Sequence, residues 1–159
     1  MPTIVPFDRE HLEAVVRLAL RAWEPVFPSI EEAMGTEIFR AQVADWRASQ
    51  SEAVEAACTD GGGEAFVALI AGEVAGFVAL RTHAADRMGE IHMIAVDPRH
   101  QRRGIAAAMT RFALARFAQA GLTTAMVETG GDPGHAPARS TYEAAGFRHV
   151  PVARYFKKL

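Results

Sequence analysis

The spacing of hydrophobic residues changes along this chain, and the change divides the chain into helical and extended segments. After Asp8, a good helix N-cap, apolar residues recur at helical spacing as far as Trp23. Pro25 and Pro28 cannot continue a helix, so we expect this one to end near Glu24.

Two weaker patterns lie on either side of that helix. The β-branched segment Thr3–Val5 predicts a short first strand. Ser29 and Glu32 have the spacing of a capping box and predict the start of a second helical region. It extends to about Cys58, and Gly35 makes a single unbroken helix doubtful.

Beyond the loop at 60–63 the pattern becomes extended. Ala65–Ile70 and Val74–Arg81 flank a short turn and predict a hairpin, and Glu90–Val96 predicts a further strand. The remaining expected elements are a helix at Arg102–Gln119, a strand at Leu122–Thr129, a short helix at Pro137–Ala145 and two last strands at Phe147–Val150 and Ala153–Phe156. This order predicts one mixed α/β domain, built on one sheet and spanning residues 1–159.

Composition narrows the class of protein. Half of the 159 residues are hydrophobic, enough for a substantial core, and the formal net charge of -2 does not favour nucleic-acid binding. The single cysteine, Cys58, excludes an internal disulfide, and the scattered histidines do not predict a metal site. There is no signal-peptide pattern and no apolar run of membrane-spanning length, so we expect a cytoplasmic protein without a membrane partner.

The most informative segment is a strand, a turn and a helix in immediate succession, from Glu90 to Ala108. The first amides of a helix lack internal partners and attract anions, and Gly104 and Ala106 would leave room for a phosphate group. Arg102 and Arg103 add positive charge. A closely packed turn with solvated arginines would have the same sequence, and both interpretations remain open at this point.

The turn resembles the pyrophosphate-binding motif of the Gcn5-related N-acetyltransferase (GNAT) superfamily, since Gln101-x-x-Gly104-x-Ala106 follows a strand ending in Val96-Asp97-Pro98. The resemblance implies a mixed, mostly antiparallel central sheet flanked by helices, with acetyl-CoA as the acyl donor. The implied donor-binding residues are Ile94, Ala95 and Val96 for the pantetheine arm, and Gln101, Arg102, Arg103, Gly104, Ile105 and Ala106 for the diphosphate.

A second segment supports the same resemblance. Ala138-x-x-x-Tyr142-x-x-x-Gly146-Phe147 is similar to a family segment whose tyrosine protonates the departing thiolate. A phenol is neutral at pH 7 and can donate a proton. The family often has Asn seven residues before this tyrosine, where this chain has His135, which either contacts the cofactor or lies exposed in its loop.

Attack by a primary amine requires a group that accepts its proton. Glu90 stands where some family members have their general base, and His92 is a second candidate. On alternate-residue geometry Glu90, His92, Ile94 and Val96 share one face of the strand unless a β-bulge intervenes. A solvated strand end is the other interpretation of Glu90.

The acceptor is predicted only as a small-molecule or peptide amine. Trp23 and Phe27 could line its pocket and Glu24 could meet a cationic amine, but an ordinary connection between helices explains these residues equally well. A non-catalytic acyl-CoA-binding or regulatory module with the same fold is the alternative to an N-acetyltransferase. By the same resemblance, dimerisation through the last strands is plausible.

Overall fold

A five-stranded sheet forms the centre of the computed structural model, which describes residues 1–43 and 45–159. Its strands lie in chain order: β1 (Thr3–Pro6), β2 (Glu64–Ile70), β3 (Glu73–His83), β4 (Met88–Val96) and β5 (Thr124–Val127). The first three neighbouring pairs are antiparallel, and only β4 and β5 run parallel. The expected mixed, mostly antiparallel sheet is therefore confirmed.

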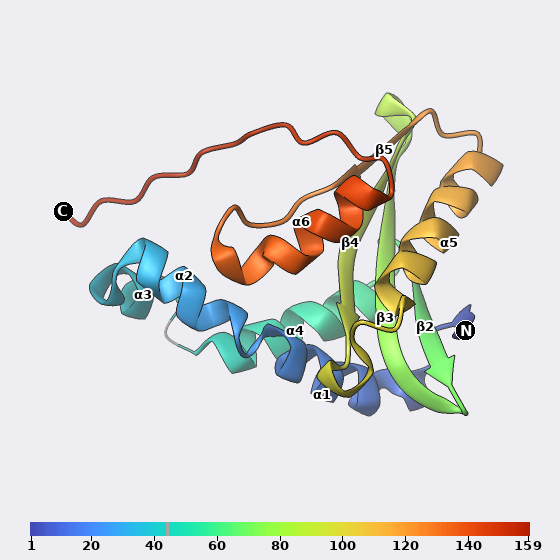
Figure 1. Cartoon of the computed structure of the whole chain (residues 1–159), viewed down its shortest axis with the longest axis horizontal. Helices are drawn as coiled ribbons and strands as arrows, with labels where there is room; N and C mark the ends of the chain where they lie inside the picture. Colours follow the sequence, from blue (N-terminus) through green and yellow to red (C-terminus); the bar gives the residue numbers. More distant parts are fainter. Residues whose placement is uncertain (44) are drawn as a thin grey trace.

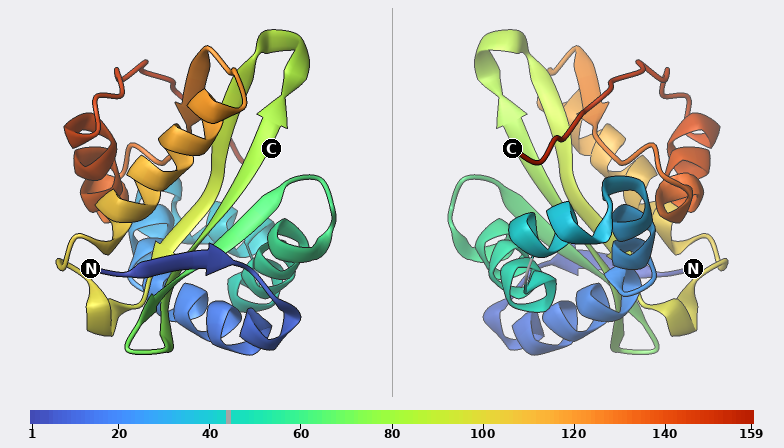
Figure 2. Two further views of the ribbon diagram at one scale, coloured as in Figure 1. Left: turned by 90° about the vertical axis from the view of Figure 1, so that its right-hand side faces the viewer. Right: turned by 90° about the vertical axis from the view of Figure 1, so that its left-hand side faces the viewer.

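Helices cover both faces of this sheet (Figure 1, Figure 2). They are α1 (Leu12–Trp23), α2 (Val26–Met34), α3 (Thr36–Gln42), α4 (Trp46–Thr59), α5 (Ile105–Gln119) and α6 (Ala136–Ala144). Short 3-10 turns lie at Arg9–His11, Ala84–Asp86, Pro98–His100 and Pro133–His135.

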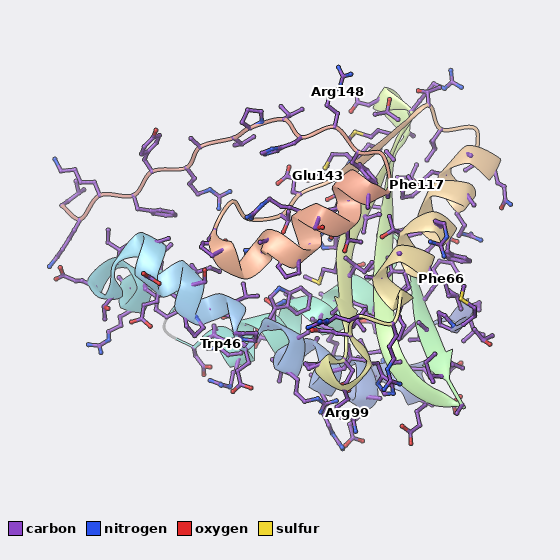
Figure 3. The ribbon with its side chains drawn as sticks, in the orientation of Figure 1. Trp46, Phe66, Arg99, Phe117, Glu143 and Arg148 are labelled. Atoms are coloured by element: carbon purple, nitrogen blue, oxygen red, sulfur yellow. The ribbon has the colours of Figure 1, made fainter. Side chains whose placement is uncertain are left out.

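The two faces have separate hydrophobic cores. On one face, α1 and α4 pack against the sheet, and Val15, Leu18 and Phe77 are fully buried there. On the other face, α5 packs against it, with Phe66 and Phe117 in the same cluster (Figure 3). The sheet is thus the middle layer of three.

A glycine in β4 sets how closely α5 approaches the sheet. A Cβ atom built on Gly89 would lie 2.3 Å from the ring of Phe117, which no real contact allows. The absence of a side chain lets that ring rest on the strand, and this fixes β4 and α5 relative to each other.

The region between α1 and β2 differs from the expectation in where its helices begin. The capping-box interpretation of Ser29 is wrong, because α2 already starts at Val26 and carries Pro28 in its first turn. Proline is tolerated there since the first amides of a helix have no internal partner. The expected break occurs at Gly35, whose φ of 85° ends α2.

The two last strands expected at Phe147–Val150 and Ala153–Phe156 are absent, and that prediction is wrong. Residues 147–159 follow α6 without regular structure and are exposed apart from the partly buried Phe147. Residues of high β propensity form a strand only where another strand pairs with their backbone, and no described segment pairs with these.

Candidate active site

One cavity of about 610 Å³ brings together most of the predicted site residues. Ten of the twelve line it: Ile94, Ala95, Val96, Gln101, Arg102, Gly104, Ile105, Ala106, His135 and Tyr142. Arg103 is exposed on the same turn and Glu90 lies beside the cavity rather than on its wall. A smaller hollow of about 270 Å³ near Gly61–Glu64 has none of the predicted residues in its lining.

The turn that leads into α5 is anchored by a buried carboxylate. Asp97 is fully buried and accepts hydrogen bonds from the backbone N of Arg99 (3.0 Å) and from its Nη2 (2.9 Å). Arg21 of α1 donates to the same carboxylate at 2.5 Å. Burial alone would raise the pKa of Asp97, but the hydrogen bonds from Arg99 and Arg21 outweigh it and hold that pKa well below its usual value. Figure 3 shows Arg99 on this loop, beyond the end of β4.

The turn itself leaves the first amides of α5 open to the cavity. The side-chain amide of Gln101 donates to the carbonyl of Val96 at 3.1 Å and folds the turn back on β4. Arg102 and Gly104 have φ values of 62° and 76°, and Gly104 is the N-cap of α5. No side-chain cap occupies these amides, and residues 101–104 are exposed. A helix start of this kind favours an anion.

A β-bulge interrupts β4 where the cavity begins. Ile91 pairs with Leu80 and Met93 with Ala79, so His92 is the extra residue. Pairing with β5 ends at Ile91, opposite Val127. From His92 onward, the edge of β4 that faces β5 therefore has no strand partner among the described residues.

The bulge also redistributes the side chains of β4. Ile91, Ile94 and Val96 belong to the core under α5, whereas Met93 and Ala95 belong to the core against α1 and α4. The shared face of Glu90, His92, Ile94 and Val96, expected for a regular strand, is therefore not formed.

Glu90 lies between two histidines. Its Oε2 is 2.6 Å from Nε2 of His83, and its Oε1 is 3.6 Å from Nδ1 of His92. His92 lines the cavity, whereas the side chain of His83 is 40% exposed. The three side chains form a continuous series of titratable groups from the cavity to the solvent.

Tyr142 projects from α6 into the same cavity and is 8% exposed. Burial raises its pKa to about 12, so the phenol keeps its proton throughout the neutral and moderately alkaline range. Its ring meets that of Phe147 edge to face, at 6.0 Å between centroids. Tyr142 can therefore act as a hydrogen-bond or proton donor.

The loop that carries His135 is tied to α2. Nδ1 of His135 lies 2.5 Å from Oδ1 of Asp132, and Asp132 accepts a hydrogen bond from Ser29 at 2.8 Å. The Gly134 amide in turn donates to the Ser29 hydroxyl at 3.0 Å. Burial would raise the pKa of Asp132, but these hydrogen bonds from His135 and Ser29 lower it. His135 is therefore held in place and is not a free loop residue.

Residues of the first two helices form another part of the cavity wall. Ala22, Trp23, Pro25 and Val26 line it. Phe27 does not, because its ring stacks on Trp46 at 4.2 Å between centroids, and Glu24 forms an ion pair with Arg47 outside the lining. The expected acceptor side is thus only partly retained in the cavity.

Three other features were considered in the described residues: a cysteine nucleophile, a metal site and a membrane-spanning helix. Burial raises the pKa of the Cys58 thiol to about 11, which leaves it protonated and poorly nucleophilic at neutral pH. In the described part of the chain no three His, Cys, Asp or Glu side chains are grouped to hold a metal ion. No helix in that part is both long and apolar enough to span a membrane.

Sequence reasoning missed Arg21, Asp97, Ser29 and Asp132 as parts of this site. Asp97 precedes a proline at the end of a strand, a pattern typical of a capping residue, so its local role was visible. Its partner Arg21 lies 76 residues away, and Ser29 lies 103 residues from Asp132. Separations of this size leave no signal in a single sequence.

Comparisons with known proteins identify the family to which the chain is similar. The chain is 35% identical over 82 residues to mycothiol acetyltransferase of Streptomyces bingchenggensis, a match that covers 52% of the chain and 26% of that protein. The chain thus spans about a quarter of the length of this curated relative.

Solved structures share the fold at low sequence identity. A GNAT-family acetyltransferase structure from Desulfovibrio desulfuricans is 21% identical, with a TM-score of 0.70 over 95% of this chain and 87% of that one. The PaiA N-acetyltransferase of Thermoplasma acidophilum, solved in complex with coenzyme A, is 16% identical, with a TM-score of 0.68 over 93% and 90% of the chains. Residues 19–147 match the model of the acetyltransferase (GNAT) family, which confirms the resemblance found in the two motifs, and the chain belongs to that family.

Proposed function

We propose that this protein transfers the acetyl group of acetyl-CoA to a primary amine by direct attack in a ternary complex. One observation carries the proposal: the anion-binding turn, the unpaired edge of β4, Tyr142 and residues from the first two helices all line a single cavity. Donor and acceptor can therefore meet in one space, as direct transfer requires.

The donor fits the residues on one side of the cavity. The free amides at the start of α5, with Arg102 beside them, suit a diphosphate. The unpaired edge of β4 at Ile94–Val96 offers backbone groups to the amides of a pantetheine arm, in the manner of an added strand. Gly104 leaves the approach to the turn open, since no atom lies within 4 Å of a Cβ built on it.

His92 and Glu90 together fit the role of proton acceptor. His92 is the group that reaches the cavity, so its ring takes the proton from the attacking amine. Glu90 lies 3.6 Å from Nδ1 of that ring and positions it, and His83 connects Glu90 to the solvent. The carboxylate thus acts through the imidazole.

Tyr142 completes the transfer as the proton donor. The departing sulfur carries negative charge when the tetrahedral intermediate collapses, and the buried neutral phenol can donate to it. Backbone amides of the bulged β4 segment are available to stabilise the oxyanion of that intermediate.

The cavity lining narrows the class of acceptor. Among its lining residues Glu128 is the one carboxylate, while Trp23, Pro25 and Val26 provide apolar surface. Such a wall suits an amine with one positive charge and an apolar body, and offers little to a polyamine. A net charge of -2 and a single cysteine fit a cytoplasmic protein that does not bind nucleic acid.

The test combines donor binding with turnover. Thermal unfolding is measured with and without acetyl-CoA, using adenosine as the control ligand. At one hundred times the dissociation constant, stabilisation should be about 2.7 kcal/mol. Thiol release is then followed across a panel of monoamines and polyamines. Binding without transfer to any amine would favour the non-catalytic module, and no stabilisation by millimolar acetyl-CoA would overturn the proposal.

A further inference from the structure

A second pair of imidazole and carboxylate reaches the cavity and has no role in the proposed amine transfer. His135 ends the turn Pro133–His135 and lines the cavity, and its Nδ1 lies 2.5 Å from Oδ1 of Asp132. Both side chains are mostly buried. The contact of His92 with Glu90 is longer, at 3.6 Å. Two imidazoles therefore line the cavity, and the one at position 135 is held more closely by its carboxylate.

The loop around this pair holds both groups in place. A Cβ atom built on Gly130 would lie 2.4 Å from Nδ1 of His135 and 2.4 Å from Oδ1 of Asp132, so the missing side chain lets the ring and the carboxylate rest on the backbone there. Nη1 of Arg139 on α6 donates to the carbonyls of Gly130 at 2.6 Å and of Asp132 at 2.8 Å, which fixes the same loop. A pair held in this way can act without first being ordered.

The other oxygen of Asp132 connects the pair to the acceptor side of the cavity. Its Oδ2 accepts a hydrogen bond from the hydroxyl of Ser29 at 2.8 Å. Ser29 lies in α2, about one turn after Val26, which lines the cavity. The turn Pro133–His135 also packs against α2 (Figure 1). His135 thus lies where α2 bounds the cavity, beside the wall proposed for the acceptor.

These contacts determine which nitrogen of His135 is free. Burial would raise the pKa of Asp132, but the hydrogen bonds from His135 and Ser29 lower it, so the carboxylate is ionised at neutral pH. An ionised carboxylate only accepts hydrogen bonds, so Nδ1 of the neutral ring carries the proton and Nε2 keeps its lone pair. None of the hydrogen bonds within residues 1–43 and 45–159 uses Nε2. An imidazole oriented in this way by a carboxylate can take the proton of a hydroxyl group.

Hydroxyl groups are the acceptors that need such a base. A primary amine, with a pKa of about 10.4, is partly neutral at pH 7 and its nitrogen is then nucleophilic. An alcohol stays protonated at that pH, like water with its pKa of about 15.7, and attacks only while an adjacent base removes its proton. We propose that His135 is the catalytic base for hydroxyl acceptors, with Asp132 positioning its ring, so that the protein also transfers the acetyl group to primary alcohols.

The reaction forms one bond and breaks one. The alcohol oxygen bonds to the carbonyl carbon of the thioester, and its proton passes to Nε2 of His135. The C–S bond then breaks, and Tyr142 protonates the departing sulfur. The proton on His135 replaces the one that Tyr142 has lost, so one alcohol and one acetyl-CoA give one ester and one free coenzyme A. This reaction rests on the proposed function, because it uses the same donor site and the same phenol; only the base and the acceptor differ.

The first test compares primary amines with alcohols of the same carbon skeleton, 2-phenylethylamine and 2-phenylethanol among them, and identifies the products by mass. We expect both amide and ester, and His135→Asn should lower the ratio of ester to amide at least about 30-fold. His149→Asn, which changes an exposed histidine, is the matched control and should leave the ratio unchanged. Amide without ester, or equal losses of both in His135→Asn, would overturn this inference and leave the proposed function standing. Neither product, with no binding of acetyl-CoA, would overturn both.

The second test asks whether Asp132 acts through the ring, and it does not depend on turnover. Nitrogen NMR of the histidine side chains reports which ring nitrogen carries the proton. We expect the neutral ring of His135 to be protonated at Nδ1, and Asp132→Asn to lose this preference together with ester formation. Ser29→Ala removes one hydrogen bond to the same carboxylate but keeps its charge, so it should keep the proton on Nδ1. A wild-type ring protonated at Nε2 would overturn the proposal.

Discussion

Replacing Asp97 by Asn tests whether the buried carboxylate holds the end of β4 and the donor-binding turn in place. The substitution keeps the shape of the side chain but removes its charge, and it leaves Arg21 and Arg99 without their anion. Breaking a fully buried ion pair costs about 3–5 kcal/mol. Here the two arginine side chains are 40% and 65% exposed, so water compensates part of the loss and we expect about 2–4 kcal/mol. For a chain of this size that corresponds to a fall in Tm of about 5–15 °C.

The measurement is urea unfolding at pH 7, with Glu13→Gln as the matched control. Glu13 also pairs with an arginine, Arg17, but both side chains are exposed, and its loss should cost less than about 0.5 kcal/mol. Because the folded pKa of Asp97 lies below its unfolded value, its stabilisation is complete above about pH 4 and disappears as the pH falls through the folded pKa. The difference between wild type and Asp97→Asn should therefore be constant from pH 5 to 8 and shrink in acid. An Asp97→Asn variant no less stable than Glu13→Gln would refute the reasoning.

Further predictions concern the cavity. Tyr142→Phe should lower kcat by about 10²-fold and leave acetyl-CoA affinity within about twofold, as measured by single-turnover kinetics and calorimetry; an unchanged kcat would remove the phenol from the reaction. The same variant should lose less stability than wild type between pH 10 and 12, because burial disfavours the phenolate and wild type forfeits up to about 3 kcal/mol there. Gly104→Ala should cost about 1 kcal/mol in urea unfolding, since its φ is 76° although no atom blocks a Cβ. His92→Gln should lower kcat by about 10²-fold, whereas Glu90→Gln should lower it less, because the carboxylate acts through the imidazole; a larger loss of kcat in Glu90→Gln would make the carboxylate the direct base.

The sequence predicted well what depends on local pattern. The helix after Asp8, the hairpin and the strand ending at Val96 all rest on periodicity and on residues that begin or end an element, and they are found close to the expected positions. The turn from Gln101 to Ala106 was also accessible, because glycine at a positive φ and a small residue in the first helical turn are local requirements.

The two strands expected after Phe147 show what local sequence patterns cannot predict. Propensity predicted strands after Phe147, and the prediction is wrong because a strand exists only where a second backbone meets it. Which backbone does so depends on distant or intermolecular geometry, which no local pattern contains.

The bulge at His92 explains why the proton acceptor could not be chosen from the sequence alone. In a regular strand Glu90, His92 and Ile94 would share a face, so the sequence favoured Glu90 as the base and left His92 as a second candidate. One extra residue opposite Ala79 moves Ile94 to the other face and places His92 on the cavity wall, with Glu90 behind it. Pairing with β5 stops one residue earlier, at Ile91, so the bulge that turns the imidazole inward lies where the edge of β4 becomes free for the donor. The bulge that places the proposed base therefore lies beside the free edge of β4 proposed for the donor, and we expect that removing it would impair transfer.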